Sequence, residues 1–250
     1  MPELAKLKIK IFADGADVAV IGEMAKNPLI KGFTTNPTLM RKANVTDYRA
    51  FARAVLTIVT KHPVSFEVFS DEFDEMELQA REIASWGNNV FVKIPVTNTR
   101  GQFAGPLIER LSRDNVQLNV TAVMTADQVR RIAAHLSEKT DSNISLFAGR
   151  IADTGRDPVP LVRECVRFLE TRPNIQLIWA SPRELLNLYH AEEAGCHIIT
   201  VTHGLLSKIP LVGKDLDQFS VETVQMFRQD ALKAGFTIDV SQPASNEYKR

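Results

Sequence analysis

The chain has 250 residues, 44% of them apolar, and its 30 basic and 30 acidic side chains cancel to a formal net charge of zero. This length fits either two average domains or one large α/β barrel. The charge balance argues against nucleic-acid binding, which needs a basic excess, and no apolar run reaches the roughly 18 residues that cross a bilayer. The opening run MPELAKLKIKIF lacks the pattern of a secretory leader, so we expect a cytoplasmic protein without nucleic-acid or membrane partners.

The two cysteines, Cys165 and Cys196, are too few for a disulfide framework or a thiolate metal cage. Both lie in apolar patterns, and we expect them to be small packing residues. The five histidines are scattered, and none forms a ligand pair such as HExxH. We therefore expect neither a metal site nor a cofactor.

Eight short runs rich in Ile, Val, Phe and Leu end in small or turn-forming residues, which is typical of buried strands. Their starts recur every 22 to 32 residues, and each gap holds a helical pattern, so the sequence predicts a repeated strand-helix unit. The predicted strands are Lys8 to Asp14, Gly32 to Asn36, Val64 to Phe69, Asn89 to Val96, Gln117 to Met124, Asn143 to Arg150, Ile175 to Ser181 and His197 to Thr202.

Helix signals lie between these runs. Thr125 and Gln128 form a capping box after the fifth run. The stretch from Ser181 to Glu184 combines a capping serine, a proline in the first turn and a glutamate at the third position, which predicts another helix start. Amphipathic helices are also predicted from about Thr46 to Thr60 and from Ser220 to Ala234.

Eight strand-helix units without a linker favour a single (β/α)8 TIM barrel over residues 1–240, since roughly 250 residues is the usual size of this fold. The alternative is a doubly wound open sheet, which would normally show a glycine-rich phosphate loop after its first strand. That position reads ADGAD, which is no such loop. The polar residues 241–250 are predicted to form a tail outside the barrel.

A barrel of this kind collects its chemistry at the carboxyl ends of the strands. Polar residues do occur near these ends, although strand ends are also polar simply because loops begin there. The argument is stronger for Glu67, Lys93 and Asn119, which lie inside otherwise apolar runs. The polar residues near the predicted strand ends are Asp14, Thr34, Asn36, Glu67, Lys93, Asn119, Thr121, Arg150, Ser181 and Arg183.

Lys93 lies in the run FVKIPV, on the same face of its strand as Phe91 and Pro95. Both faces of a barrel strand are buried, so a lysine there must be paired or must lose its proton. A neutral amine in an apolar pocket is a nucleophile for carbonyl groups, which indicates Schiff-base formation. The alternative is a lysine that extends to solvent at the barrel rim.

An imine site also needs a proton shuttle and groups that bind hydroxyls. Glu67 on the adjacent strand is the best candidate for the acid or base, although it could also form only a salt bridge to Lys93. Asp14 could bind an ammonium or a hydroxyl, or cap the first helix. Asn36 and Asn119 suit hydroxyls, or merely satisfy backbone groups.

A phosphate site is predicted at Arg150, Ser181 and Arg183. Barrels often bind phosphate after strands seven and eight, against a helix N-terminus, and two guanidinium groups can clamp a phosphate dianion. In the alternative interpretation, Ser181 is only a helix cap.

At these residues the sequence resembles the transaldolase family, from Ile11 to about Ala234. TTNP and VKIP in this order and spacing are a specific combination. The resemblance implies that Lys93 forms a Schiff base with a ketose phosphate and that the retained dihydroxyacetone unit passes to an aldose phosphate, as in the pentose phosphate pathway. The matching stretches are FADGAD, TTNPTLM, SFEV, FVKIPVT, LNVTAVM, SLFAGRIAD and WASPRE.

The resemblance also implies roles for single residues. Asp14 and Asn36 would contact the dihydroxyacetone unit, and Glu67 would shuttle protons through a water near Thr121. Asn119 would position the imine or a hydroxyl. The remaining matched residues would complete the substrate site (Thr34, Ser145 and Phe147) and hold the phosphate (Arg150, Ser181 and Arg183).

Within the broader family, fructose-6-phosphate aldolases resemble a separate branch. This branch has glutamine where this chain has Glu67 and tyrosine where it has Phe147. The residues found here favour transfer over simple aldol cleavage. Gly15 and Pro182 depart from the family pattern, which bears on the substrate more than on the imine chemistry. The compact branch tends to form rings of subunits, so a homo-oligomer is expected.

Two further hypotheses stay open. One is an aldolase that releases free dihydroxyacetone, which would turn over without an acceptor. The other is a non-catalytic sugar-phosphate binding protein in which Lys93 only pairs with Glu67.

Overall fold

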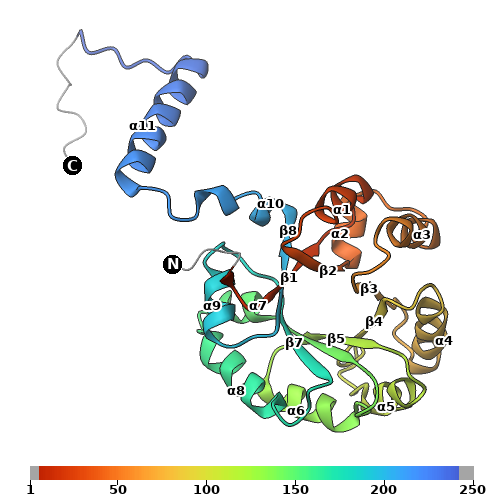
Figure 1. Ribbon diagram of the computed structural model, residues 1–250. Helices are drawn as coiled ribbons and strands as arrows, with labels where there is room; N and C mark the ends of the chain where they lie inside the picture. The colour runs from red at the N-terminus through yellow and green to blue at the C-terminus, as the bar shows by residue number, and fades with distance from the viewer. Residues whose placement is uncertain (1–5, 242–250) are drawn as a thin grey trace. The chain divides into compact units, whose positions relative to one another are not determined.

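The computed structural model describes residues 6–241 and shows eight parallel strands closed into a barrel in chain order. Helices lie around the outside of this ring (Figure 1). The predicted (β/α)8 barrel is therefore confirmed. The strands are β1 (Lys10–Asp14), β2 (Ile30–Thr34), β3 (Val64–Glu67), β4 (Val90–Pro95), β5 (Leu118–Val123), β6 (Ser142–Leu146), β7 (Ile175–Trp179) and β8 (Ile198–Thr202). The helices are α1 (Val18–Met24), α2 (Pro37–Lys42), α3 (Tyr48–Ile58), α4 (Phe73–Ala84), α5 (Gly105–Arg113), α6 (Ala126–His135), α7 (Ala148–Ala152), α8 (Val159–Leu169), α9 (Asn187–Glu193), α10 (His203–Leu206), the 3-10 turn η2 (Ile209–Leu211) and α11 (Leu216–Lys233).

Each predicted strand run overlaps one observed strand, although β2 already begins at Ile30, and the clearest difference concerns the sixth run. The run predicted from Asn143 to Arg150 ends as a strand at Leu146. The chain then turns into the short helix α7, whose Gly149 amide donates to the carbonyl of Ala180 at 3.2 Å. Arg150 is therefore carried by a helix just beyond the strand end.

The barrel interior changes from apolar to polar toward the carboxyl ends of the strands. Phe12, Ile178 and Ile198 form a buried cluster of their own. Gly32 makes room for the Phe12 ring, since a Cβ at this glycine would lie 2.5 Å from it. Strand alternation places Asp14 on the same face as Phe12, one step nearer the carboxyl end. The apolar cluster thus forms a floor below polar side chains.

Two predicted helix signals are found where the sequence puts them. The Thr125 hydroxyl accepts from the Gln128 amide at 3.2 Å, and the Gln128 side chain accepts from the Thr125 amide at 3.1 Å, which completes the capping box of α6. The helix predicted from about Thr46 to Thr60 is α3. Its buried face consists of Phe51, Ala52 and Val55.

The helix predicted to start at Ser181 is wrong. Ser181 has a left-handed φ of 58°, and α9 begins only at Asn187. The Asn187 side-chain oxygen instead accepts from the amides of Arg183 and Glu184 at 2.8 and 3.2 Å. This contact closes a loop in front of α9, so no helix N-terminus begins at Ser181.

The chain divides into two compact units at the boundary between Ile209 and Pro210. The first unit holds the barrel. The second holds α11, which corresponds to the helix predicted from Ser220 to Ala234, and none of the residues of α11 is buried. The predicted end of the barrel domain at residue 240 stays a prediction. The tail predicted at 241–250 lies outside the described residues, apart from Ser241.

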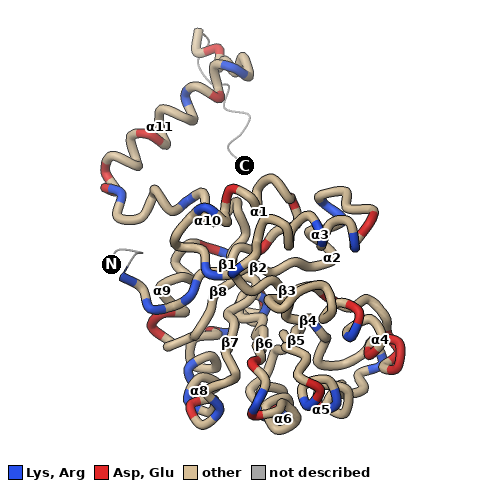
Figure 2. Tube along the Cα trace, turned by 45° about the vertical axis from the view of Figure 1, so that its right-hand side comes forward, with Lys and Arg blue, Asp and Glu red and all other residues tan. Residues whose placement is uncertain are grey.

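The surface carries both signs of charge, and acidic and basic residues occur together along outer helices such as α4, α5 and α8 (Figure 2). Cys165 and Cys196 are both buried and free, as expected for packing residues. Within residues 6–241, no helix is both long and apolar enough to cross a membrane.

Candidate active site

A pocket of about 420 Å³ opens at the carboxyl ends of the strands, the end at which such barrels carry their chemistry. Strands from all around the ring contribute to it. Of the predicted site residues, Asn119 lies beneath the lining. The predicted residues that line the pocket are Asp14, Thr34, Asn36, Glu67, Lys93, Thr121, Ser145, Phe147, Arg150, Ser181 and Arg183.

Lys93 lies in the middle of β4 and is only 6% exposed. Its Nζ donates to the carbonyl of Thr35 at 2.8 Å and lies 3.2 Å from Oε2 of Glu67. This burial rules out the alternative of a lysine that extends to solvent. A neighbouring carboxylate can take the ammonium proton, and the neutral amine is then a nucleophile for a carbonyl carbon.

Glu67 is the last residue of β3 and lies beside Lys93 in the sheet register. Its side chain is 17% exposed, so the ion pair is largely screened from water. The ion pair and an acid-base role are compatible, because hydrogen-bond distance is what proton transfer requires. Thr121 lies nearby on β5, and its Oγ1 is buried without a hydrogen-bond partner among the described residues. This oxygen is able to bind a polar group in the pocket.

Asp14 is held by polar side chains from β2 and the following turn. The Thr34 hydroxyl donates to Oδ1 at 2.8 Å, and the Asn36 amide donates to Oδ2 at 3.4 Å. The Thr34 hydroxyl also lies 2.5 Å from that of Thr200 on β8. Burial raises the pKa of Asp14, and this effect outweighs the opposing charge of Lys93 and the two hydrogen bonds.

Of Asp14 and Asn36, only Asn36 caps a helix. Asp14 does not cap the first helix, because Asp17 is the N-cap of α1. Asn36 is the N-cap of α2, and its Oδ1 accepts from the Leu39 amide at 3.0 Å. Its Nδ2 still faces Asp14, so the cap fixes the orientation in which Asn36 enters the pocket.

Asn119 is fully buried beside Lys93 in the sheet register. Its amide nitrogen donates to the Ser65 hydroxyl at 3.0 Å, and its oxygen accepts from the Ser145 hydroxyl at 2.8 Å. From beneath the pocket, Asn119 thus fixes the orientation of the Ser145 hydroxyl, which lines the pocket.

Arg150 and Phe147 form one side of the pocket mouth. The Arg150 guanidinium lies over the Phe147 ring, 5.2 Å from its centroid. Arg150 has no carboxylate partner among residues 6–241. Its positive charge is therefore available to an anion.

Arg183 is held by a carboxylate instead. Its Nε lies 3.1 Å from Oδ1 of Asp153, and its Nη2 contacts the other oxygen. Gly149 lets α7 approach the loop after β7, because a Cβ at this position would lie 1.5 Å from the carbonyl oxygen of Ser181. The close contact, and not a helix start, gives the loop after β7 its shape.

The pocket also contains residues that the sequence analysis did not select. Thr200 and Thr202 of β8 line it, and Thr200 completes the hydroxyl chain to Asp14. Their signal is the alternation of threonine with Ile and Val in IITVT, which ordinary strands also show. The sequence therefore predicted strand eight but no site residue in it.

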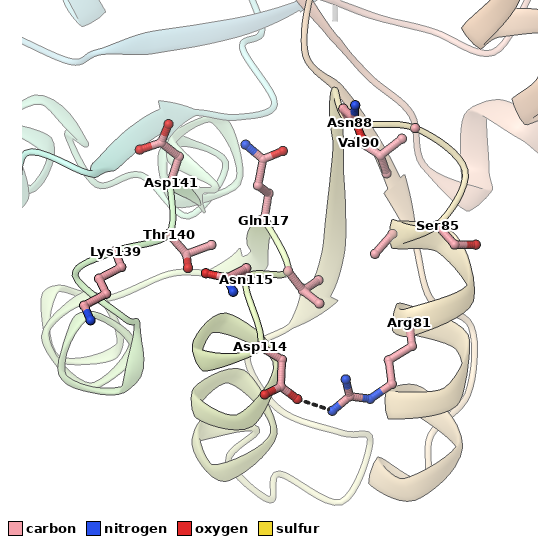
Figure 3. Close-up of a pocket in the computed structure, with 13 residues that line it drawn as sticks. Arg81, Ser85, Asn88, Val90, Asp114, Asn115, Gln117, Lys139, Thr140 and Asp141 are labelled. Carbon is pink, nitrogen blue, oxygen red and sulfur yellow. Dashed lines mark hydrogen bonds and ion pairs between the residues drawn. The ribbon is translucent and has the colours of Figure 1, made fainter.

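A second pocket lies at the opposite, amino-terminal ends of β4 to β6 (Figure 3). Arg81 and Asp114 pair across its outer side at 2.7 Å, and Gln117 and Asp141 line its inner part. Both members of this ion pair are exposed, and such pairs contribute little energy.

No group of three or more His, Cys, Asp or Glu side chains within the described part of the chain could hold a metal ion. The carboxyl-end pocket remains the candidate site.

The model of the transaldolase/fructose-6-phosphate aldolase family matches residues 11–244. The chain belongs to this family. Its activity is accordingly of the transaldolase type, and the resemblance noted in the sequence is confirmed.

The relatives match this chain over nearly their own full length. A protein named "Probable transaldolase" from Dehalococcoides mccartyi is 31% identical over 86% of this chain and 97% of its own. One named "Probable transaldolase 2" from Listeria monocytogenes is 34% identical over 84% of this chain and 94% of its own. Among solved structures, 2,3-dimethylmalate lyase matches with a TM-score of 0.55 at 12% identity, covering 96% of this chain and 89% of that one. That likeness shows the barrel fold alone.

Proposed function

We propose that this enzyme transfers a dihydroxyacetone unit from a ketose phosphate to an aldose phosphate through a Schiff base on Lys93. The observation that carries the proposal is the buried Lys93 amine, 3.2 Å from the Glu67 carboxylate. The same pocket is lined by Arg150, which has no carboxylate partner within the described residues. This combination fits a substrate with a carbonyl group at one end and a phosphate at the other.

The first half of the reaction is imine formation. Glu67 takes the proton of the Lys93 ammonium, and the amine attacks the ketose carbonyl. Glu67 then returns a proton to the hydroxyl of the carbinolamine, which leaves as water. The unpartnered Thr121 hydroxyl supports a path for this proton through a bound water.

The second half is carbon-carbon cleavage. Asp14 takes the proton of the hydroxyl on C4, the C3–C4 bond breaks, and its electrons pass to the imine, which becomes an enamine. The raised pKa of Asp14 supports this role, because a base is most effective when its pKa approaches the working pH. The enamine then attacks the aldehyde of an acceptor in the reverse sequence.

The phosphate end of the substrate is assigned to Arg150, Arg183 and the Ser181 hydroxyl. Two guanidinium groups, one from α7 and one from the loop after β7, suit a phosphate dianion. Thr34, Asn36 and Ser145 are assigned to the hydroxyls of the three-carbon unit, with Asn119 supporting Ser145. Sugar phosphates of the pentose phosphate pathway type carry both of these groups, the phosphate and the hydroxyls.

Borohydride reduction in the presence of fructose 6-phosphate tests the imine. Mass spectrometry of the digested protein should find a sugar-derived adduct on Lys93. An unmodified Lys93 in protein that turns over substrate would overturn the assignment. Release of free dihydroxyacetone with and without erythrose 4-phosphate separates transfer from simple cleavage, because a transferase stays nearly silent without an acceptor.

We also infer a homo-oligomer and a cytoplasmic location. The homo-oligomer is supported by large apolar side chains of α11 that are not buried within their own unit, among them Leu216, Val224 and Phe227. The location is supported by two free thiols, which are typical of a reducing compartment. Light scattering coupled to size-exclusion chromatography tests the oligomer. Cell fractionation tests the location.

A further inference from the structure

Strand β3 loses its neighbour on one side before it reaches its own end. β2 pairs with β3 only at Phe33 with Val64 and at Thr34 with Ser65. Thr35 makes the last contacts, because its amide and its hydroxyl both donate to the Ser65 carbonyl, at 3.2 and 2.9 Å. Beyond this point the chain turns into α2.

The backbone of Glu67 faces the resulting gap. The amides of Val64 and Val68 donate to the other neighbour, β4, at Asn89 and Lys93. Because alternate residues of a parallel strand bond to opposite neighbours, the amide and carbonyl of Glu67 point to the side that β2 has left. A polar backbone group left unpaired there would be unfavourable.

The hydroxyl of Tyr48, the first residue of α3, fills this gap. It accepts from the Glu67 amide at 2.7 Å and donates to the Glu67 carbonyl at 3.1 Å. Burial raises the pKa of Tyr48, so the hydroxyl keeps the proton that it donates. Edge contacts with Phe66 and Trp86, at centroid distances of 6.2 and 5.5 Å, hold the ring in place.

We propose that Tyr48 is a positioning residue for the reaction: its hydroxyl replaces the missing strand residue and fixes the backbone of Glu67, which keeps the carboxylate beside Lys93. Tyr48 does not itself line the pocket. The inference rests on the proposed function, in which Glu67 transfers the proton. A displacement of about 1 Å at a reacting group lowers a rate by up to about 10²-fold.

The test compares Tyr48→Phe with wild type in the transfer reaction from fructose 6-phosphate to erythrose 4-phosphate. The substitution removes one oxygen and keeps the aromatic packing. We expect kcat to fall by roughly tenfold or more while KM stays within about twofold. Tyr189→Phe is the matched control, because the Tyr189 hydroxyl is buried without a hydrogen-bond partner among the described residues. It should leave kcat unchanged.

The same substitution in a Glu67→Gln background distinguishes positioning from general support of the fold. If Tyr48 acts through Glu67, then Tyr48→Phe has little further effect on kcat once the carboxylate is gone. An equal loss in both backgrounds, or no loss in the wild-type background, overturns the proposal.

Amide hydrogen exchange on the wild type provides a test that needs no variant to fold. The Glu67 amide should be strongly protected although no strand residue covers it, and rapid exchange at this amide contradicts the contact. A wild type that is silent with sugar phosphates overturns the proposed function instead, and the exchange rate still reports on Tyr48.

Discussion

The amine of Lys93 and the carboxylate of Glu67 lie 3.2 Å apart on two neighbouring strands, β4 and β3. The pair is buried, so neither group can exchange its partner for water without a rearrangement. In the proposed mechanism, the carboxylate that pairs with the ammonium at rest lies next to the carbinolamine that has to be protonated.

Glu67→Gln keeps the shape of this side chain and removes its capacity to take a proton. We expect kcat for transfer to fall by about 10²-fold, the usual contribution of an acid-base group. Borohydride trapping on Lys93 should slow in parallel, because imine formation also needs this proton transfer. Unchanged turnover would assign Glu67 to the ion pair alone.

Asp14→Asn tests the raised pKa of this carboxyl. Because the folded-state pKa lies above the ordinary value of 3.8, the folded protein binds the Asp14 proton more tightly than the unfolded chain does. The ionised carboxylate thus lowers stability as pH rises from about 4 through the folded pKa. The asparagine variant lacks this loss, so its Tm relative to wild type should increase over that range, while kcat falls by about 10²-fold. A pH-independent Tm difference would contradict the raised pKa.

The sequence predicted the barrel and most of the pocket lining for different physical reasons. The strands were predictable because burial on both faces requires continuous apolar runs at a regular spacing. Lys93 and Glu67 were predictable because a charge inside such a run is unfavourable unless it has a function or a partner. In both cases the local sequence already carries the constraint.

The rest depends on contacts between distant segments. Local capping signals favour a helix at Ser181, but the close approach of Gly149 places Ser181 in a left-handed conformation instead. Tyr48 reads as an ordinary apolar position of a helix, and its hydroxyl gains a role only because β2 ends before β3. Thr200 has the composition of any strand residue, and only closure of the barrel brings it to Thr34.

Asp153→Asn tests the proposed role of Arg183 in phosphate binding. Both members of this ion pair are about half exposed, so its loss should change stability by less than about 1 kcal/mol. The guanidinium loses its fixed orientation, and KM for fructose 6-phosphate should rise several-fold. The addition of dihydroxyacetone to glyceraldehyde, in which neither reactant carries a phosphate, should not change. Glu193→Gln is the matched control, because it breaks a comparable exposed pair with Arg163. Equal effects on both substrates would contradict a role in phosphate binding.

Gly149→Ala tests the contact that shapes the loop after β7. The new Cβ would lie 1.5 Å from the Ser181 carbonyl oxygen, so the loop must move. We expect a lower Tm and an approximately tenfold higher KM for phosphorylated donors. Gly204→Ala serves as the control, since nothing lies within 4 Å of its Cβ position. An unchanged KM in the Gly149 variant would show that the loop adjusts without moving the phosphate site.

The two cysteines should be inert in the native protein. Burial raises the pKa of Cys165 to about 11 and that of Cys196 to about 12, so both remain thiols at pH 8. Because the thiolate is the reactive form, a disulfide reagent such as dithionitrobenzoate should label neither residue in the folded enzyme. Both should react once guanidinium unfolds the chain, and the labelling rate below the unfolding transition should follow the unfolding rate. Rapid labelling of either thiol in the native enzyme would contradict its burial.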